Sequence, residues 1–445
     1  MLFNTPEFAV FFVLVAIVVY LLNRRQWVAT RNVALLAASY GFYANLNLCY
    51  PLLLLFVTVI NYVGARILAR SGQSDRGRKW TIGVTIMVSL IPLVVLKYAP
   101  MYTDSLWLPV GLSFFTFQAL TYSIDVYRRK IEVPFSFPDV ALFVAFFPTL
   151  LSGPIERARN LIPQLRQKLD MNWGNLVTGA QHFTWGLFKK AVIADRLAEW
   201  VNMIYAGGAS HTGGTLAVAA ILYSFQIYCD FSGYASMAIG TGRMLGIRLM
   251  DNFQFPYFAA SIKDFWRRWH ISLTTWFTEY VYISLGGNRV SRLRWVLNIS
   301  AVFLLSGVWH GATWSFVIWG AIHGILYLVE HFLRVEGSWG IYRLFVFVGV
   351  TLAWMFFRIE DTALVVQMIG KMITGPWLPI RWGALLLPIA AATVGLLVLF
   401  IIIEWLYYRG WLPQNRLCRV IGFASLLVMI SLFAASSEQF VYFKF

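Results

Sequence analysis

Long apolar runs separated by short polar stretches make up most of the chain. A helix needs about 20 apolar residues to cross about 30 Å of hydrocarbon, and runs of this kind recur from one end to the other, several of them interrupted by glycine or proline. Because a backbone in lipid must satisfy its own hydrogen bonds, such continuous runs indicate helices, whereas a membrane β-barrel would show short alternating strands. The pattern predicts an all-α polytopic membrane protein with roughly nine to thirteen spans. The runs lie near residues 8–22, 32–48, 50–69, 80–98, 107–127, 138–152, 176–194, 214–242, 296–313, 314–334, 341–358, 383–408 and 417–435.

The composition supports a membrane location. Of the 445 residues, 59% are hydrophobic and 13% are charged, whereas a soluble domain carries about 25% charged residues. The longest polar stretches have the size of loops, so we expect a single membrane-embedded body over residues 1–445. The first run is followed by Asn23-Arg24-Arg25 without a clear cleavage site, which predicts a retained helix rather than a signal peptide.

The net charge of +16 is best explained by topology. No nucleic-acid-binding signature is present, and the Lys and Arg residues gather between apolar runs, as the positive-inside rule requires. Basic clusters follow the first, third and fifth runs, so we expect the N-terminus to lie outside. These clusters contain Arg24, Arg25 and Arg31; Arg66, Arg70, Arg76, Arg78 and Lys79; and Arg128, Arg129 and Lys130.

One basic stretch breaks this alternation. Residues 156–168 are also basic, yet one more crossing through 138–152 would place them outside. Either the segment 138–152 is re-entrant, or a basic amphipathic helix lies along the membrane interface. The sequence leaves both alternatives open.

The stretch 256–295 has a poor spanning profile and an unusual density of amphipathic side chains. Such residues suit a membrane interface or a buried, water-lined re-entrant segment rather than a lipid-facing helix. They are Trp266, Arg267, Arg268, Trp269, His270, Trp276, Glu279, Tyr280 and Tyr282.

His310 and His323 lie inside apolar runs, each in a pattern of aromatic residue, spacer and His-Gly. A histidine in such a run is costly and is a functional hypothesis by default. An imidazole can take the proton from a hydroxyl as that hydroxyl attacks a thioester, and basic residues can hold the phosphates of an anionic donor. The alternative is a neutral histidine hydrogen-bonded to a neighbouring helix. The sequence predicts no metal site and contains no Gly-x-Ser-x-Gly nucleophile motif.

Several ordered motifs resemble the bacterial alginate O-acetyltransferase branch of the membrane-bound O-acyltransferases. They are DFWRRWHISL at 264–273, YVYISLGGNR at 280–289, YCDFSGY at 228–234, WHG at 309–311, GPIER at 153–157 and FVYFKF at 440–445. The resemblance implies a core at about 100–335, flanking helices over 1–99 and 336–435, and a tail at 436–445. It also implies a ring of about 11 transmembrane helices, with re-entrant or interfacial helices and a central tunnel between a cytoplasmic donor site and the outer face.

The same resemblance implies roles for individual residues. His310 is expected to be the catalytic general base and His270 a second functional histidine at the floor between the two membrane faces. Tyr442 in the tail is expected to accept the acyl group transiently, with an aromatic interface anchor as the alternative. We expect seven further residues to shape the donor site or tunnel: Asp230, Arg267, Arg268, Trp269, Trp309, Asn288 and His323. For Asp230, Arg267, Arg268 and Trp269 the alternative is a role in structural pairs or as interface anchors.

The expected reaction moves an acetyl group from cytoplasmic acetyl-CoA, a substrate rather than a bound cofactor, across the bacterial inner membrane. The acceptors would be hydroxyls of an exported polysaccharide such as alginate, with a periplasmic acetyltransferase of the SGNH type as partner. One rival has the same fold carrying D-alanyl groups from a carrier protein to teichoic acid. A rival of another class is a transporter or channel with a structural pair of histidines.

Overall fold

All regular structure among the residues described by this computed structural model is helical, which confirms the predicted fold class. These residues are 1–70, 72, 74–98, 109–334, 340–380, 387–412 and 415–435. The chain divides into two compact units. The first holds Met1–Phe183 and Tyr234–Asp251, and the second holds Thr184–Gly233 and the described residues from Asn252 onward. Helices α9 (Trp173–Phe188) and α11 (Gly213–Met244) contribute residues to both units.

Eight helices among the described residues are long and apolar enough to cross a membrane. The chain is therefore a multi-pass membrane protein, with fewer long helices in the described ranges than the expected ring of about 11. Several predicted runs form shorter helices: α2 (Val28–Ala44) has 17 residues and α5 (Leu112–Tyr127) has 16. The eight candidate spans are Pro6–Arg24, Tyr50–Leu68, Asp75–Tyr98, Gly213–Met244, Arg292–His310, Trp314–Leu333, Gly340–Arg358 and Ala391–Tyr408.

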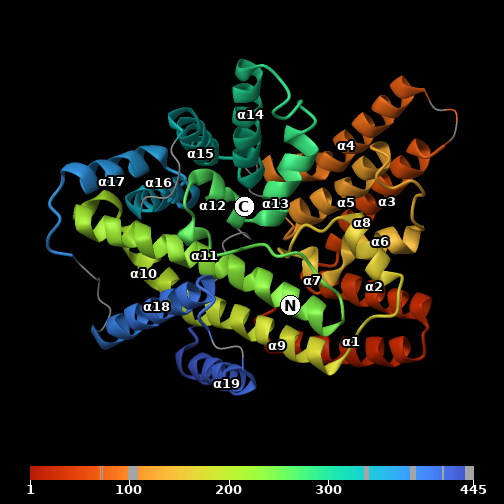
Figure 1. Cartoon of the computed structure of the whole chain (residues 1–445), viewed down its shortest axis with the longest axis horizontal. Coiled ribbons are helices and arrows are strands. Elements are labelled where there is room, and N and C mark those ends of the chain that lie inside the picture. Colours follow the sequence, from red (N-terminus) through yellow and green to blue (C-terminus); the bar gives the residue numbers. More distant parts are fainter. Residues whose placement is uncertain are drawn as a thin grey trace. The chain divides into compact units, whose positions relative to one another are not determined.

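The first unit contains the N-terminal helices, coloured red to yellow in Figure 1. Helices α3, α4 and α5 pack against one another and share a chain of buried polar contacts, in which Ser123 Oγ donates to Asn61 Oδ1 (2.7 Å) and Asn61 Nδ2 donates to Ser89 Oγ (2.9 Å). The helices are α1 (Pro6–Arg24), α2 (Val28–Ala44), α3 (Tyr50–Leu68), α4 (Asp75–Tyr98), α5 (Leu112–Tyr127), α6 (Phe137–Ala145), α7 (Phe147–Leu150) and α8 (Ala158–Leu165).

The segment 138–152 forms the short helices α6 and α7 instead of one long span. Helix α6 has 9 residues, a length of about 14 Å at 1.5 Å per residue, which is less than half of the hydrocarbon thickness. Asp139, in the first turn of α6, accepts a hydrogen bond at 3.1 Å from Arg166, which follows the last residue of α8. The chain therefore returns after α6 to the start of that helix, while α8 buries Leu161, Ile162 and Leu165 on one face, so both alternatives stay open.

The basic stretch 156–168 lies beside the other basic stretches of the first unit. Contacts within the first unit hold this stretch beside the other basic stretches, so all of them lie at one end. The Arg31 side chain is fully buried and belongs to this network rather than to an exposed loop. The connecting contacts are Arg31 Nη1 to the Gln167 carbonyl (2.9 Å), Arg78 Nη2 to the Tyr127 carbonyl (2.7 Å) and Arg159 to Asp125 (3.6 Å).

Glu156 of the GPIER motif is a buried structural residue of the first unit, 2% exposed. Its Oε1 accepts a hydrogen bond from the Met250 N–H (2.6 Å), and its own N–H donates to Gln118 Oε1 (3.1 Å). Burial raises the pKa of the Glu156 carboxyl to about 7, an effect that the Met250 hydrogen bond and the Arg157 charge only partly offset.

The second unit contains the stretch 256–295, most of which forms short helices rather than one long span. Helix α12 begins where Ser261 Oγ accepts the Asp264 N–H (2.9 Å) and the Glu330 carboxylate accepts the Ile262 N–H (2.5 Å). These acceptors satisfy N–H groups that a helix start leaves unpaired. Alongside α10 (Asp195–Ala206), the unit's elements are a π-helical segment (Lys189–Ala194), 3₁₀ turns (Gly208–Ser210 and Pro256–Phe258), α12 (Ile262–Arg268), α13 (Ile271–Trp276), a second π-helical segment (Phe277–Tyr282), α14 (Arg292–His310), α15 (Trp314–Leu333), α16 (Gly340–Arg358), α17 (Thr362–Thr374), α18 (Leu387–Tyr408) and α19 (Arg416–Phe433).

Helices α14 and α15 form a closely packed antiparallel hairpin. A Cβ atom added at Gly320 would lie 2.5 Å from the Phe303 carbonyl oxygen, so only glycine allows this approach of the two backbones. Small residues at such crossings are typical of membrane helix packing. The crossing fixes the end of α14, where His310 lies, against α15.

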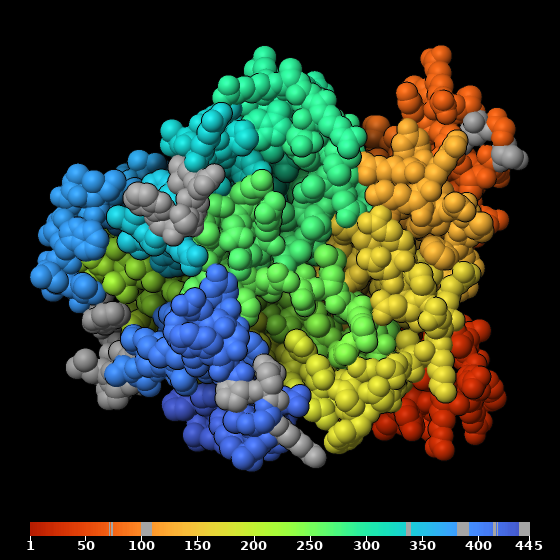
Figure 2. Space-filling model, viewed as in Figure 1, coloured from red at the N-terminus to blue at the C-terminus, as the bar shows by residue number. Residues whose placement is uncertain are grey.

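Helices α18 and α19, coloured blue in Figure 2, lie at the surface of the second unit. Their outward side chains are apolar, with Val398 49%, Ile402 48% and Leu417 67% exposed. Surfaces of this kind suit contact with lipid rather than water.

Candidate active site

His310 is the last residue of α14 and is 4% exposed. Its imidazole ring packs edge-on against three aromatic rings, with centroid distances of 4.7 Å to Trp309, 4.9 Å to Trp319 and 5.1 Å to Phe357. A helix carries partial negative charge at its C-terminus, which favours a positive group there. The position therefore suits a base that becomes an imidazolium during proton transfer.

His323 lies in the middle of α15 and is fully buried. Its ring is 5.1 Å from that of Trp319, which also contacts His310, and 4.9 Å from that of Trp266. Among the described residues neither ring nitrogen of His323 has a hydrogen-bond partner, so this histidine is not held by a hydrogen bond from a neighbouring helix there. Trp319 thus joins two of the predicted site histidines in one aromatic cluster.

His270 adopts a left-handed backbone conformation (φ 44°, ψ 53°) at the start of α13. Its Nδ1 lies 3.2 Å from Asn252 Oδ1, which also accepts hydrogen bonds from the Ser272 N–H (3.1 Å) and hydroxyl (2.9 Å). Because an amide oxygen only accepts, Nδ1 must carry the proton and Nε2 the lone pair. Burial lowers the pKa of His270 to about 3, so the ring is neutral near pH 7.

Trp309 connects His270 to His310. The Trp309 ring is 6.3 Å from the His270 ring and 4.7 Å from the His310 ring. We call His270, Trp309, His310, Trp319 and His323 the histidine cluster. The structure thus brings together four residues that the sequence singled out and adds Trp319.

Asp230 lies near this cluster and belongs to a buried ion-pair group. Lys190 Nζ is 2.9 Å from Asp230 Oδ1 and 2.7 Å from Asp195 Oδ1, and all three side chains are buried. The next residue, Phe231, places its ring 4.6 Å from that of His270. Asp230 therefore holds α11 in place behind His270.

The remaining predicted residues lie in different environments. Trp269 is buried and packs against Trp354 (4.8 Å between centroids). Arg268 donates to Asp264 (2.9 Å), whereas Arg267 is exposed. Asn288 is exposed in the turn after the second π-helical segment, and Tyr442 lies outside the described residues.

Sequence reasoning missed Asn252, Lys190, Trp319 and Phe357. A signal existed for Lys190, because Lys189-Lys190 interrupts an apolar run and charges in such runs are usually functional or paired. Asn252 carried no signal, since its role depends on a fold that brings it to His270, 18 residues along the chain.

Comparison with known proteins identifies the family. The description "MBOAT, membrane-bound O-acyltransferase family" matches residues 36–335. The chain belongs to the membrane-bound O-acyltransferase family. It is therefore an enzyme of the O-acyltransferase class.

Individual relatives agree with the bacterial branch that the motifs resemble. The chain is 38% identical over 401 residues to a probable alginate O-acetylase of Azotobacter vinelandii, covering 85% of this chain and 79% of the relative. A peptidoglycan O-acetyltransferase of Helicobacter pylori is 35% identical over 429 residues (84% and 80%). A teichoic acid D-alanyltransferase of Streptococcus thermophilus is 29% identical over 277 residues (57% and 64%).

Proposed function

We propose that this enzyme takes an acetyl group from cytoplasmic acetyl-CoA and passes it across the membrane toward hydroxyls of an exported polysaccharide, with His310 as the general base. The observation that carries the proposal is the position of His310, buried at a helix C-terminus in contact with Trp309 and Trp319. Burial in an aromatic environment strengthens local electrostatics.

In the proposed step the His310 imidazole takes the proton of the attacking hydroxyl. The hydroxyl oxygen forms a bond to the acetyl carbonyl carbon, the carbon–sulfur bond of the thioester breaks, and the proton passes on to the CoA sulfur. General-base assistance of this kind contributes about 10²- to 10⁴-fold in rate. His270, a neutral imidazole fixed by Asn252, is proposed to support the same site.

The comparisons favour acetyl over D-alanyl as the transferred group. The acetyltransferases match 84–85% of this chain at 35–38% identity, whereas the D-alanyltransferase matches 57% at 29%. By analogy with the names of these relatives, the acceptor is proposed to be a polysaccharide or a peptidoglycan-like glycan.

We place the protein in the bacterial inner membrane with its N-terminus outside. The basic stretches that gather at one end of the first unit would then face the cytoplasm, as the positive-inside rule expects. A periplasmic acetyltransferase of the SGNH type is the proposed partner on the outer side, and Tyr442 is the proposed transient acceptor between the two.

Radiolabelled acetyl-CoA offered to detergent-purified protein tests this proposal. We expect CoA release by the wild type and loss of release in His310→Ala. Label retained on the wild type but absent from Tyr442→Phe supports the tyrosyl relay. If CoA release continues without retained label, the relay is wrong and the acyltransferase assignment stands.

Two outcomes of the same experiment would overturn the proposed donor or base. CoA release that is equal in His310→Ala and wild type would remove His310 from the mechanism. No CoA release, combined with transfer from a D-alanyl carrier protein, would assign the enzyme to the D-alanyl branch.

A further inference from the structure

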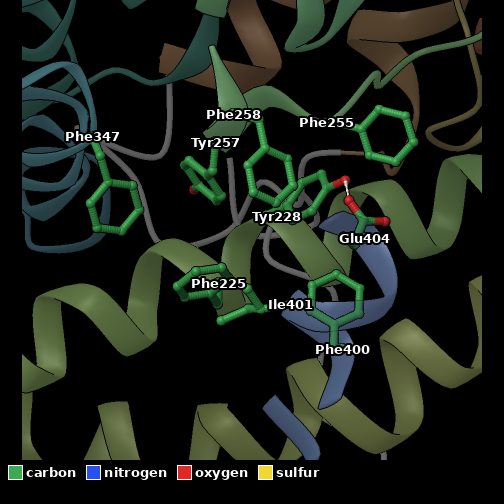
Figure 3. A pocket seen from close by; sticks show the side chains of 9 residues that line it. All are labelled: Phe225, Tyr228, Phe255, Tyr257, Phe258, Phe347, Phe400, Ile401 and Glu404. Carbon is green, nitrogen blue, oxygen red and sulfur yellow. Dashed lines mark hydrogen bonds between the residues drawn. The ribbon is translucent and has the colours of Figure 1, made fainter. Parts of the chain in front are cut away.

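An aromatic cavity in the second unit lies apart from His310 and has no assigned role. Figure 3 shows its lining residues, which come from α11, the segment 255–258, α16 and α18. The cavity measures about 170 Å³, close to the size of apolar cavities of about 150 Å³ that bind benzene. Its lining residues are Phe225, Tyr228, Phe255, Tyr257, Phe258, Phe347, Phe400, Ile401 and Glu404.

The polar side chains in this lining bond to the protein rather than offering groups to a polar ligand. The Tyr228 hydroxyl donates to Glu404 Oε2 (2.7 Å), and the Tyr257 hydroxyl donates to the Ser224 carbonyl (2.5 Å). Lys189 also interacts electrostatically with Glu404. A polar ligand would lose its hydration without gaining partners, whereas an apolar ligand would gain close contacts with the rings.

The cavity lies beside helix faces that contact lipid chains in a bilayer. Ile401 and Phe347, which line it, lie on α18 and α16, both candidate membrane spans. The outward faces of these helices are apolar and exposed, including Ile402 (48%), Val398 (49%) and Phe345 (56%). In a bilayer these faces contact lipid chains, so hydrocarbon lies next to the cavity.

One end of the cavity is close to side chains typical of a membrane interface. Phe258 stacks on Tyr408 at the end of α18 (5.2 Å between centroids), and Arg268 lies over the same ring (5.7 Å). Arg409 follows and lies over Trp405 (5.7 Å). Aromatic and basic residues of this kind anchor a helix end at the headgroup level, and Arg409 can pair with a phosphate.

We propose that this cavity binds the terminal segment of a phospholipid acyl chain, with the lipid phosphate near Arg409. A donor acetyl group, with its single methyl carbon, is far smaller than the cavity. The bound chain would contact Tyr228 and Tyr257, whose rings each lie 6.2 Å from that of Trp269, the neighbour of His270. The lipid would therefore support the packing behind the histidine cluster.

Photo-crosslinking of the full chain in nanodiscs tests the proposal. The probe is phosphatidylethanolamine with a diazirine at the end of one acyl chain, and the labelled peptides are identified by mass spectrometry. We expect labelling of the peptides that contain Phe225 and Phe400. In Ile401→Trp this labelling should fall at least about tenfold, because the added ring volume fills the cavity.

Ile402→Trp is the matched control, since Ile402 lies next to Ile401 and faces outward. It should retain the labelling. If Ile401→Trp does not fold, Phe347→Trp fills the cavity from α16 and carries the same expectation.

Three results would overturn the proposal. First, a cavity-filling variant could leave the labelling unchanged. Second, the label could be found only on the outward faces of α16 and α18. Third, added acetyl-CoA could abolish the labelling. The last result would assign the cavity to the acyl donor. None of these results depends on His310 being the base.

Discussion

Gly320 determines how closely α15 approaches α14. Replacing it with alanine should lower the rate of acyl transfer by displacing His310, although Gly320 itself is not proposed to contact the reacting groups. The new Cβ would lie 2.5 Å from the Phe303 carbonyl oxygen, whereas ordinary contact begins near 3.4 Å. The new Cβ and the Phe303 carbonyl oxygen must therefore move apart by about 0.9 Å (3.4 Å minus 2.5 Å). This movement would shift α15 against α14, whose last residue is His310. A displacement of about 1 Å costs on the order of 10² in rate when it disturbs reacting groups.

Gly324, one turn further along α15, is the matched control. A Cβ there would lie 3.4 Å from the Phe303 side chain, which is ordinary contact. Both substitutions gain about 1 kcal/mol of helix propensity, but only Gly320→Ala adds overpacking of about 1–3 kcal/mol. Gly320→Ala should therefore be less stable than Gly324→Ala.

The assay combines the rate of CoA release from acetyl-CoA with the thermal unfolding midpoint of the purified variants. We expect Gly324→Ala to resemble wild type and Gly320→Ala to lose about 10²-fold in rate. Equal rates and midpoints for the two variants would refute the close-packing argument, and so would an equal loss in both.

Three further predictions concern stability in detergent. Burial raises the pKa of the Glu156 carboxyl from 4.5 to about 7 in the folded protein. The free energy of unfolding should therefore fall by on the order of 3 kcal/mol as the pH rises from about 4.5 to about 7. The unfolded state loses the Glu156 proton first, so the thermal midpoint should be lower at pH 8 than at pH 5. Glu156→Gln should remove this part of the pH dependence, and a pH dependence unchanged in that variant would contradict the prediction. Asn252→Ala should destabilise by about 1–3 kcal/mol because the buried Ser272 N–H loses its acceptor, and an unaltered midpoint would count against that role. His270→Val should be about 1–2 kcal/mol less stable than His270→Asn, because asparagine tolerates the left-handed backbone and a β-branched residue does not, and equal midpoints would exclude this strain.

Much of the fold could be predicted because lipid imposes a simple rule on the sequence. Apolar runs of sufficient length became α1, α3, α4 and α14 to α16, and most of the stretch at 256–295, with its poor spanning profile, does not form a long span. The segment 138–152 could not be resolved from sequence. Its path depends on the contact between Asp139 and Arg166, 27 residues apart, which no local pattern reveals.

The candidate site shows the same division. His310 and His323 were identified because polar residues in apolar runs are costly, and His270 because its motif resembles that of the family. The residues that hold them were not predictable. Lys190 reaches Asp230 only after the chain has folded, and Phe357 comes from α16 to the His310 ring.

The most direct test of the central claim is the rate of CoA release by His310→Gln, measured on protein whose thermal midpoint matches that of wild type. Glutamine keeps a polar side chain but cannot accept the proton. The account predicts a loss of about 10²- to 10⁴-fold. A rate within about tenfold of wild type would contradict His310 as the general base, because general-base catalysis contributes more than this.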